Sequence, residues 1–125
     1  MIHLDTHVVA WLYAGDLRRF PQPVIDLLDA EELQVSPMVL LELQYLHEIG
    51  RASDPAETVF RGLEREIGLK ICDRPFPEVI LSALGRSWTR DPFDRLIASQ
   101  AEVAGVSLLT KDQSLLAHEA HALWG

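Results

Sequence analysis

The stretch Ile2-His3-Leu4-Asp5-Thr6-His7 decides how the rest of the chain is interpreted. It is a short apolar strand that runs straight into a carboxylate, and the amphipathic pattern of a helix follows at once with Val8, Val9 and Leu12. Open α/β sheets hold their ligands at the carboxyl ends of their strands. Asp5 is therefore a candidate functional residue at the end of the first strand.

Composition indicates one globular domain, residues 1–125, because the chain is 48% hydrophobic and 24% charged. We see no signal peptide and no apolar run of the roughly 20 residues that span a bilayer. Cys72 is the only cysteine, so an internal disulfide is impossible, which fits a reducing cytoplasm. The net charge of -8 argues against binding of nucleic acid by a broad basic surface. It is compatible with a local basic rim, or with metal ions that reverse the charge of a site.

Short apolar stretches recur along the chain, and helical patterns separate them. This alternation predicts an α/β fold in which helices cover both faces of a parallel sheet. The expected strands lie near residues 2–5, 33–36, 69–72, 106–109 and 122–124.

Glu42 lies in a predicted helix over residues 37–49, which Ser36 caps and Pro37 begins. The helical period places Glu42 on one stripe with the apolar residues Met38 and Tyr45; Leu41 and Ile49 also follow this period. An isolated carboxylate that points into a core is costly, and a nearby cation removes that cost. The alternative is a glutamate at the edge of the stripe that reaches solvent or an arginine.

Three further aspartates precede or begin predicted helices. Asp94 shares a helix face with Ile97 and leans towards the core, although acids also favour the first turn of a helix for electrostatic reasons. Asp91 fits the N-cap of that helix, with a direct role in a site as the alternative. Asp112 follows a predicted strand and could simply cap the last helix, as Asp5 could cap the first.

If the first and fourth strands are neighbours, Asp5, Asp94 and Asp112 crowd one edge of the sheet, and Glu42 approaches from the helix after the second strand. We call these four acids the acidic quartet. Carboxylates so close repel one another unless cations lie among them. An all-oxygen cluster suits Mg²⁺ or Mn²⁺ rather than Zn²⁺, and such ions support phosphodiester cleavage.

For other polar side chains near the quartet, the sequence gives weaker support for a role in the site. The hydroxyls of Thr6 and Thr110 could orient ligands or phosphate, or they could cap helices and turns. Arg90, Arg95 and Lys111 could form the local basic rim that binds substrate, or they could be solvated surface charges.

Two motifs outside the quartet favour structural interpretations. His118 and His121 are three apart, but Glu119 and the chain end indicate a solvated tail rather than a metal site. Trp88, in an arginine-rich loop, could stack on a base, although a role in packing or in binding a partner is the favoured interpretation.

Four segments together resemble the PIN-domain family, and most of all the VapC toxins of bacterial type II toxin–antitoxin pairs. The resemblance covers essentially the whole chain, in order. The segments are Leu4-Asp5-Thr6-His7, Ser36-Pro37 with Leu41-Glu42-Leu43, Arg90-Asp91-Pro92-Phe93-Asp94-Arg95-Leu96-Ile97-Ala98, and Leu109-Thr110-Lys111-Asp112.

The resemblance implies a PIN-like three-layer α/β/α sandwich with a short, mainly parallel central sheet of four to five strands. It implies a cytoplasmic Mg²⁺- or Mn²⁺-dependent endoribonuclease whose acidic residues map onto the quartet. Asp5 and Asp94 would be the principal metal ligands, Glu42 would hold a second metal or orient the attacking water, and Asp112 would act directly or through water. Asp91 matches the first acid of its block and could assist.

The resemblance also implies a homodimer and a small antitoxin that covers the site, often with a basic side chain. Helices 37–49 and 54–67 are our candidates for the antitoxin contact. Two rival hypotheses remain: a PIN-domain nuclease that processes RNA without an antitoxin, and an inert PIN-like module that binds proteins.

Overall fold

The computed structural model describes residues 1–125, and its centre is a sheet of five short strands that all run parallel. In space the strands follow the order β3-β2-β1-β4-β5. Their bounds are β1 (Ile2–Leu4), β2 (Leu33–Val35), β3 (Lys70–Ile71), β4 (Ser107–Leu109) and β5 (Ala122–Leu123). The predicted parallel sheet is thus confirmed.

The first strand lies in the middle of the sheet. Ile2 pairs with Leu33 of β2 on one side and with Ser107 of β4 on the other. The chain builds β2 and β3 outward from one side of β1 and then crosses to the other side for β4. The order of strands therefore reverses between β1 and β4, and such a reversal opens a crevice at the carboxyl ends of the strands.

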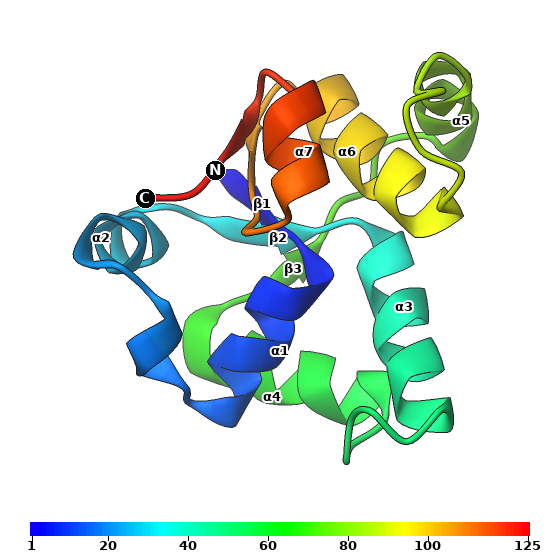
Figure 1. Ribbon diagram of the computed structural model, residues 1–125. Coiled ribbons are helices and arrows are strands. Elements are labelled where there is room, and N and C mark those ends of the chain that lie inside the picture. Colours follow the sequence, from blue (N-terminus) through cyan, green and yellow to red (C-terminus); the bar gives the residue numbers. More distant parts are fainter.

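Helices cover both faces of the sheet (Figure 1), as the sequence predicts: α1 and α4 lie on one side, and α5, α6 and α7 lie on the other. The α-helices are α1 (Thr6–Ala14), α2 (Gln22–Ala30), α3 (Pro37–Glu48), α4 (Ala56–Ile67), α5 (Phe76–Leu84), α6 (Pro92–Ala104) and α7 (Gln113–His118), and a short 3-10 helix, η1 (Leu17–Arg19), follows α1. None of these helices is both long and apolar enough to cross a lipid bilayer.

The helix ends lie where the local sequence predicts them. Ser36 accepts a hydrogen bond from the backbone of Met38 and so caps α3, and the Asp91 carboxylate caps α6 in the same way. Gly105 ends α6 with a φ of 72°, a left-handed conformation that favours glycine. These local signals fix the start of both helices that carry Glu42 and Asp94.

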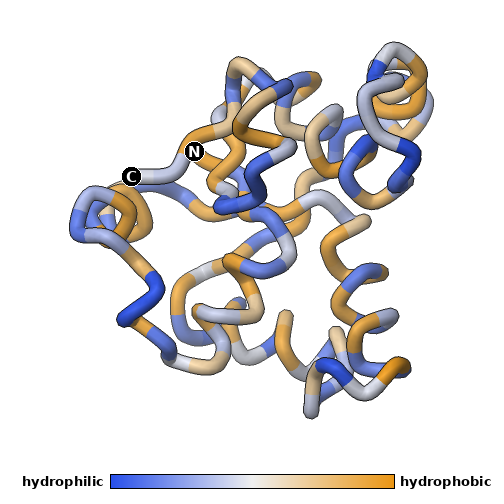
Figure 2. Tube along the Cα trace, viewed as in Figure 1, coloured by the Kyte–Doolittle hydropathy of each residue, from blue (hydrophilic) through white to orange (hydrophobic).

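One large hydrophobic core joins the sheet to its helices and contains β1, β4 and the inner faces of α1, α4 and α6. Figure 2 shows hydrophobic and hydrophilic residues alternating along the helices, the pattern of helices with one buried side. In α6, the residues from Leu96 to Ala101 are all buried. This helix is therefore surrounded by protein, and Asp94 lies where it enters the core.

The predicted inner stripe of α3 is partly wrong. Val39 and Leu43 are the buried residues of this helix, whereas Leu41 is 56% exposed and Tyr45 49% exposed. Two positions along a helix correspond to about 200° of rotation, so Leu41 and Val39 cannot both face the core. The sequence of α3 is apolar on several sides, and its period alone does not identify the side that packs.

Candidate active site

Asp5 lies at the carboxyl end of β1, in the crevice between β1 and β4. Its backbone N–H donates to the carbonyl of Leu109 at 3.0 Å, which continues the pairing of the two strands. The carboxylate accepts hydrogen bonds from the Thr6 backbone N–H at 2.8 Å and from the Thr110 hydroxyl at 2.6 Å. Burial raises the pKa of Asp5 above its usual value, although these two hydrogen bonds act against the rise.

Glu42 reaches the same region from α3. The Thr6 hydroxyl donates a hydrogen bond to its carboxylate, so Thr6 connects Asp5 and Glu42 through its backbone and its side chain. Burial raises the pKa of Glu42, and the negative charges of Asp5 and Asp91 raise it further. Glu42 is half-buried, as its predicted inward orientation requires.

Asp94, in the first turn of α6, also has a raised pKa. Burial is the main cause that raises its pKa to about 7, and repulsion from Asp91, Asp5, Asp112 and Glu42 adds to the rise. All the predicted acids thus lie close enough to Asp94 to disfavour its charge. Asp94 is half-buried, so its carboxylate is accessible from solvent.

Asp91 and Asp112 have the capping roles that the sequence suggests. Asp91 accepts from the backbone of Phe93 at 2.8 Å, and Asp112 accepts from the backbone of Leu115 at 2.9 Å. Both carboxylates are exposed. In Asp112 the bond to Leu115 engages one oxygen, so the other oxygen remains free for a ligand.

The donor set of the quartet fits Mg²⁺ or Mn²⁺. All four ligands are carboxylates, the hard oxygen donors that these cations prefer. No three of the four bring an oxygen within 4.8 Å of one another, as expected for like charges that repel. The ligand roles expected for Asp5, Asp94, Glu42 and Asp112 stay predictions.

A cleft of about 220 Å³ opens beside two of these acids. It is lined by Asp5, His7, Trp11, Lys111 and Asp112. Lys111 thus lies beside the quartet, as predicted for a basic rim. Sequence analysis assigned no role to Trp11 or His7, because their helical pattern is that of any amphipathic helix.

The two predicted arginines of the rim have local partners. Arg90 donates to the carbonyl of Ser87 at 2.7 Å, and Arg95 donates to the carbonyl of Thr89 at 2.8 Å. These bonds order the loop before α6. A role for either arginine in substrate binding stays a prediction.

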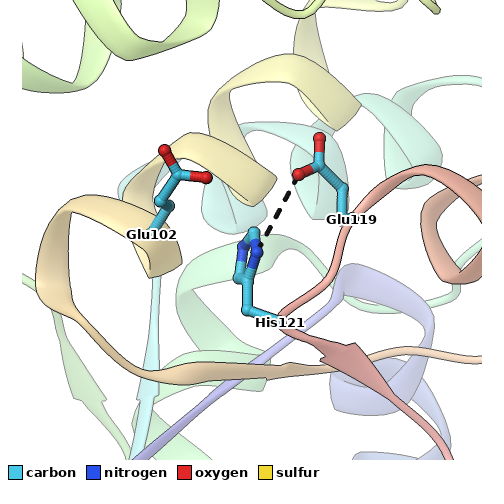
Figure 3. Close-up of side chains that lie close together, drawn as sticks. All are labelled: Glu102, Glu119 and His121. Atoms are coloured by element: carbon cyan, nitrogen blue, oxygen red, sulfur yellow. Dashed lines mark ion pairs between the residues drawn. The ribbon is translucent and has the colours of Figure 1, made fainter.

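A second acidic cluster lies away from the quartet (Figure 3) and consists of Glu102, Glu119 and His121, each with one ligand atom within 4.8 Å of the others. The Arg86 guanidinium lies 2.6 Å from the Glu102 carboxylate and 2.8 Å from that of Glu119. Arg86 thus supplies the positive charge that a metal would otherwise bring. We interpret this cluster as structural.

The predicted solvated tail is wrong at Glu119, which is buried. Besides Arg86, the Trp88 indole N–H donates to its carboxylate at 3.0 Å. Trp88 also stacks on His118 with 4.7 Å between ring centroids and 2° between planes. The packing interpretation of Trp88 is therefore the correct one. Arg86 was missed because its partner lies 33 residues further along the chain.

Comparison with known proteins agrees with this architecture. A sequence model of the PIN domain matches residues 2–120. Among curated proteins, no sequence is significantly similar to this chain.

Several solved structures share the fold over 98% of this chain. VapBC2 from Rickettsia felis, bound to a DNA fragment from its promoter, is 15% identical, with a TM-score of 0.69 and 96% of that chain covered. FitAcB from Neisseria gonorrhoeae is 22% identical, with a TM-score of 0.57 and 96% covered. PAE2754 from Pyrobaculum aerophilum is 24% identical, with a TM-score of 0.54 and 87% covered. The family match extends over nearly all of the sequence that builds the sheet and the quartet, and the chain belongs to the PIN-domain family.

Proposed function

We propose that this protein is a Mg²⁺- or Mn²⁺-dependent endoribonuclease that acts in the cytoplasm as the toxin of a type II toxin–antitoxin pair. Membership of the PIN-domain family supports a nuclease. The similar structures include VapBC2 and FitAB complexes bound to DNA, which supports an antitoxin partner. The observation that carries the proposal is the gathering of acids around Asp94: burial is the main cause that raises its pKa to about 7, and the negative charges of Asp91, Asp5, Asp112 and Glu42 raise it further.

The chain positions the quartet through rigid neighbours. Thr110 holds Asp5 from the end of β4, and Thr6 holds Glu42 from the start of α1. Both threonines are fully buried, so each is confined to one arrangement. A bound divalent cation would stabilise charge on the phosphate oxygens and activate water for attack on the phosphodiester. In this proposal Glu42 orients that water or holds a second cation, and its hydrogen bond from Thr6 supports such a role.

An apolar groove of about 490 Å³ supports the antitoxin contact that we propose for α3 and α4. Leu40 and Leu41 line it from α3, Phe60 lines it from α4, and Ile71 lines it from β3. A volume of this size accepts the apolar face of a helix, since one turn of a helix occupies roughly 400 Å³. Glu57 and Arg61 lie at the groove and offer charges for pairing.

The nuclease proposal is tested by cleavage of a mixed RNA pool with purified, partner-free protein in Mg²⁺, Mn²⁺ or EDTA. We expect cutting only with a metal, and a loss of at least about a hundredfold in Glu42→Gln and Asp94→Asn, because each removes several kcal/mol of electrostatic stabilisation. Glu48→Gln is the matched control, since it makes the same change on the exposed side of α3. Equal cutting by wild type, Glu42→Gln and Asp94→Asn would overturn the proposal.

The antitoxin proposal is tested by co-expression with a small DNA-binding protein encoded beside this gene. Leu41→Asp places a charge in the groove and should abolish co-purification, whereas Leu17→Asp, at a leucine of similar exposure on η1, should not. A complex that survives Leu41→Asp contradicts the groove assignment. An active nuclease with no such neighbouring gene would favour the RNA-processing alternative, and a chain that neither cuts RNA nor binds Mn²⁺ would favour the inert module.

A further inference from the structure

The cleft beside the quartet contains an aromatic ring and a cation that the metal chemistry does not use. Asp5 and Asp112 form one part of its lining, and Trp11 and Lys111 form another. A molecule in this cleft would therefore touch the acids and the indole at once. The cleft holds about 220 Å³.

Trp11 is held in place by its neighbours. Its ring meets Phe20 at 6.3 Å and 64°, and it meets Trp124 at 6.1 Å and 69°, both edge-on geometries that aromatic pairs favour. The residue is nevertheless only half-buried. It thus presents an aromatic surface that is already ordered, so binding of a ligand does not cost the conformational entropy of fixing this side chain.

The two cations near the indole differ in whether a carboxylate already pairs with them. The Arg19 guanidinium lies 4.9 Å from the ring centroid, but it is paired with Asp16 at 2.9 Å. The Lys111 ammonium lies 5.9 Å from the same centroid and has no carboxylate within 4.0 Å. Lys111 is also exposed and lines the cleft. An anion that enters the cleft would therefore find an uncommitted positive charge beside an aromatic surface.

We propose that this cleft binds one nucleotide of the RNA strand next to the scissile phosphate, with its base against Trp11 and its phosphate at Lys111. The proposal rests on the proposed nuclease function and names the residues that position its substrate. Base stacking on an aromatic ring tolerates any sequence and favours unpaired bases. A local site of this kind also suits a chain whose net charge of -8 repels RNA at longer range.

The experiment uses a short single-stranded RNA with a mapped cut, and a series in which each nucleotide in turn lacks its base. For the wild type, one abasic position beside the cut should lower kcat/KM by about tenfold to a hundredfold. Trp11→Leu should lower kcat/KM for the intact RNA by a similar factor and show no further loss at that abasic position. Trp11→Phe should retain most of the activity and the abasic penalty, and Mn²⁺ affinity should be unchanged in all three proteins.

Lys111→Ala tests the phosphate contact against Lys70→Ala, which removes the same charge from the exposed edge strand β3. Lys111→Ala should reduce the slope of log KM against log salt by about 0.7, the contribution of one contact to a single strand. Lys70→Ala should leave the slope unchanged. This pair needs no substitution inside the aromatic cluster, so it remains informative if Trp11→Leu does not fold.

Identical abasic penalties in wild type and Trp11→Leu, or equal slopes in Lys111→Ala and Lys70→Ala, overturn the inference. So does a Trp11→Leu variant that cuts RNA normally but loses its antitoxin, since the cleft would then hold a protein side chain. Binding of the same RNA in EDTA separates this inference from the nuclease proposal. A chain that cuts nothing, yet binds RNA in a Lys111-dependent manner, overturns the proposed function and keeps the nucleotide cleft.

Discussion

At Asp94, the stability of the metal-free protein conflicts with the negative charge that metal binding needs. Its pKa is raised from 3.8 to about 7 in the folded protein, so the folded state binds the proton more tightly than the unfolded state does. Metal-free protein should therefore lose stability as the pH rises from about 4 to about 7. Asp94→Asn should raise the melting temperature of metal-free protein at about pH 8 and change it much less at about pH 5.

Mg²⁺ should reverse which of the two proteins, wild type or Asp94→Asn, is the more stable. Wild type should gain stability with added Mg²⁺ because only the folded state assembles the ligands, and Asp94→Asn should gain little. Asp29→Asn, an exposed aspartate on α2, is the control and should melt like wild type in both conditions. Calorimetry in EDTA and in Mg²⁺ measures all three, and an Asp94→Asn protein that is less stable than wild type at about pH 8 in EDTA contradicts the assignment.

His3 provides a second dependence on pH, of opposite sign. It is buried in β1, neither of its ring nitrogens has a hydrogen-bond partner, and burial lowers its pKa from 6.5 to about 4. The nearby Gln34 favours the charged ring and His121 disfavours it, but no hydrogen bond to Gln34 is formed. Above pH 6.5 the ring is neutral in both states and does not reduce the stability of the fold. As the pH falls from 6.5 towards 4, the unfolded state binds a proton at His3 that the folded state resists, so stability is lost.

His3→Leu should remove this loss, because leucine fills a similar space without polar atoms. The variant should exceed wild type in free energy of unfolding by on the order of 3 kcal/mol more at about pH 4 than at about pH 7. Urea titrations at the two pH values measure the difference, and the quartet cancels from it because both proteins carry the same acids. A difference that does not change with pH would mean that folding leaves the pKa of His3 unchanged.

At the residue scale, the sequence identifies the acids but not the surroundings that shift the pKa values of Asp94 and His3. Glu42 is found because its position in a helix is local information, and Asp5 is found because it follows an apolar strand directly. His3 looks like any strand residue, because its missing hydrogen bonds depend on side chains that other segments bring together. Trp11 was overlooked for the same reason.

Between elements, Arg86 is the main polar connection. It donates to the backbone carbonyl of Ser82 at the end of α5, to Glu102 on α6 and to Glu119 ahead of β5. Arg86→Ala would leave Glu119 buried without its cation, so we expect a loss of about 3–5 kcal/mol in unfolding free energy. Arg61→Ala, which breaks the exposed pair with Glu64, should lose less than about 1 kcal/mol. Equal losses in urea unfolding would contradict the structural role.

The positions of strands and helices along the chain were largely predictable, whereas the side of a helix that packs against the core was not. Strands and helix starts follow from nearby residues, such as Ser36 with Pro37 and Asp91 with Pro92. The buried side of α3 depends on how α1, α4 and α6 surround it, and an apolar helix offers more than one side. Glu119 was misassigned because proximity to the chain end is a weak guide when a distant arginine folds back onto the segment.

At the scale of the whole molecule, α5 carries an apolar surface that the fold leaves uncovered. Leu81 and Leu84 are three apart, so they share one side of the helix, and they are 69% and 67% exposed. We propose that the expected homodimer forms through this surface. Leu81→Lys should convert a dimer to a monomer in light scattering, while Leu17→Lys, on a leucine 60% exposed, should remain dimeric. A monomeric wild type at all concentrations would contradict the homodimer.

The architecture of the whole chain was predictable because alternating strands and helices leave few topologies. Parallel strands joined by helices place all carboxyl ends on one edge, and the pairing of β1 with β4, which the sequence left as a condition, brings Asp5 and Asp112 together. The cleft at Trp11 needed the final packing, since Trp124 and Phe20 reach it from distant parts of the sequence.

Asp5, Asp91 and Asp112 each cap a helix with the same carboxylate that faces the site. Asparagine caps helices about as well as aspartate does, and a change of one base in the codon converts one residue into the other. A gene that changes by this single step would encode a protein that keeps the helix cap but loses one negative charge. Loss of charge at these positions is therefore expected to leave the fold intact, so a folded chain is not by itself a sign of an active one.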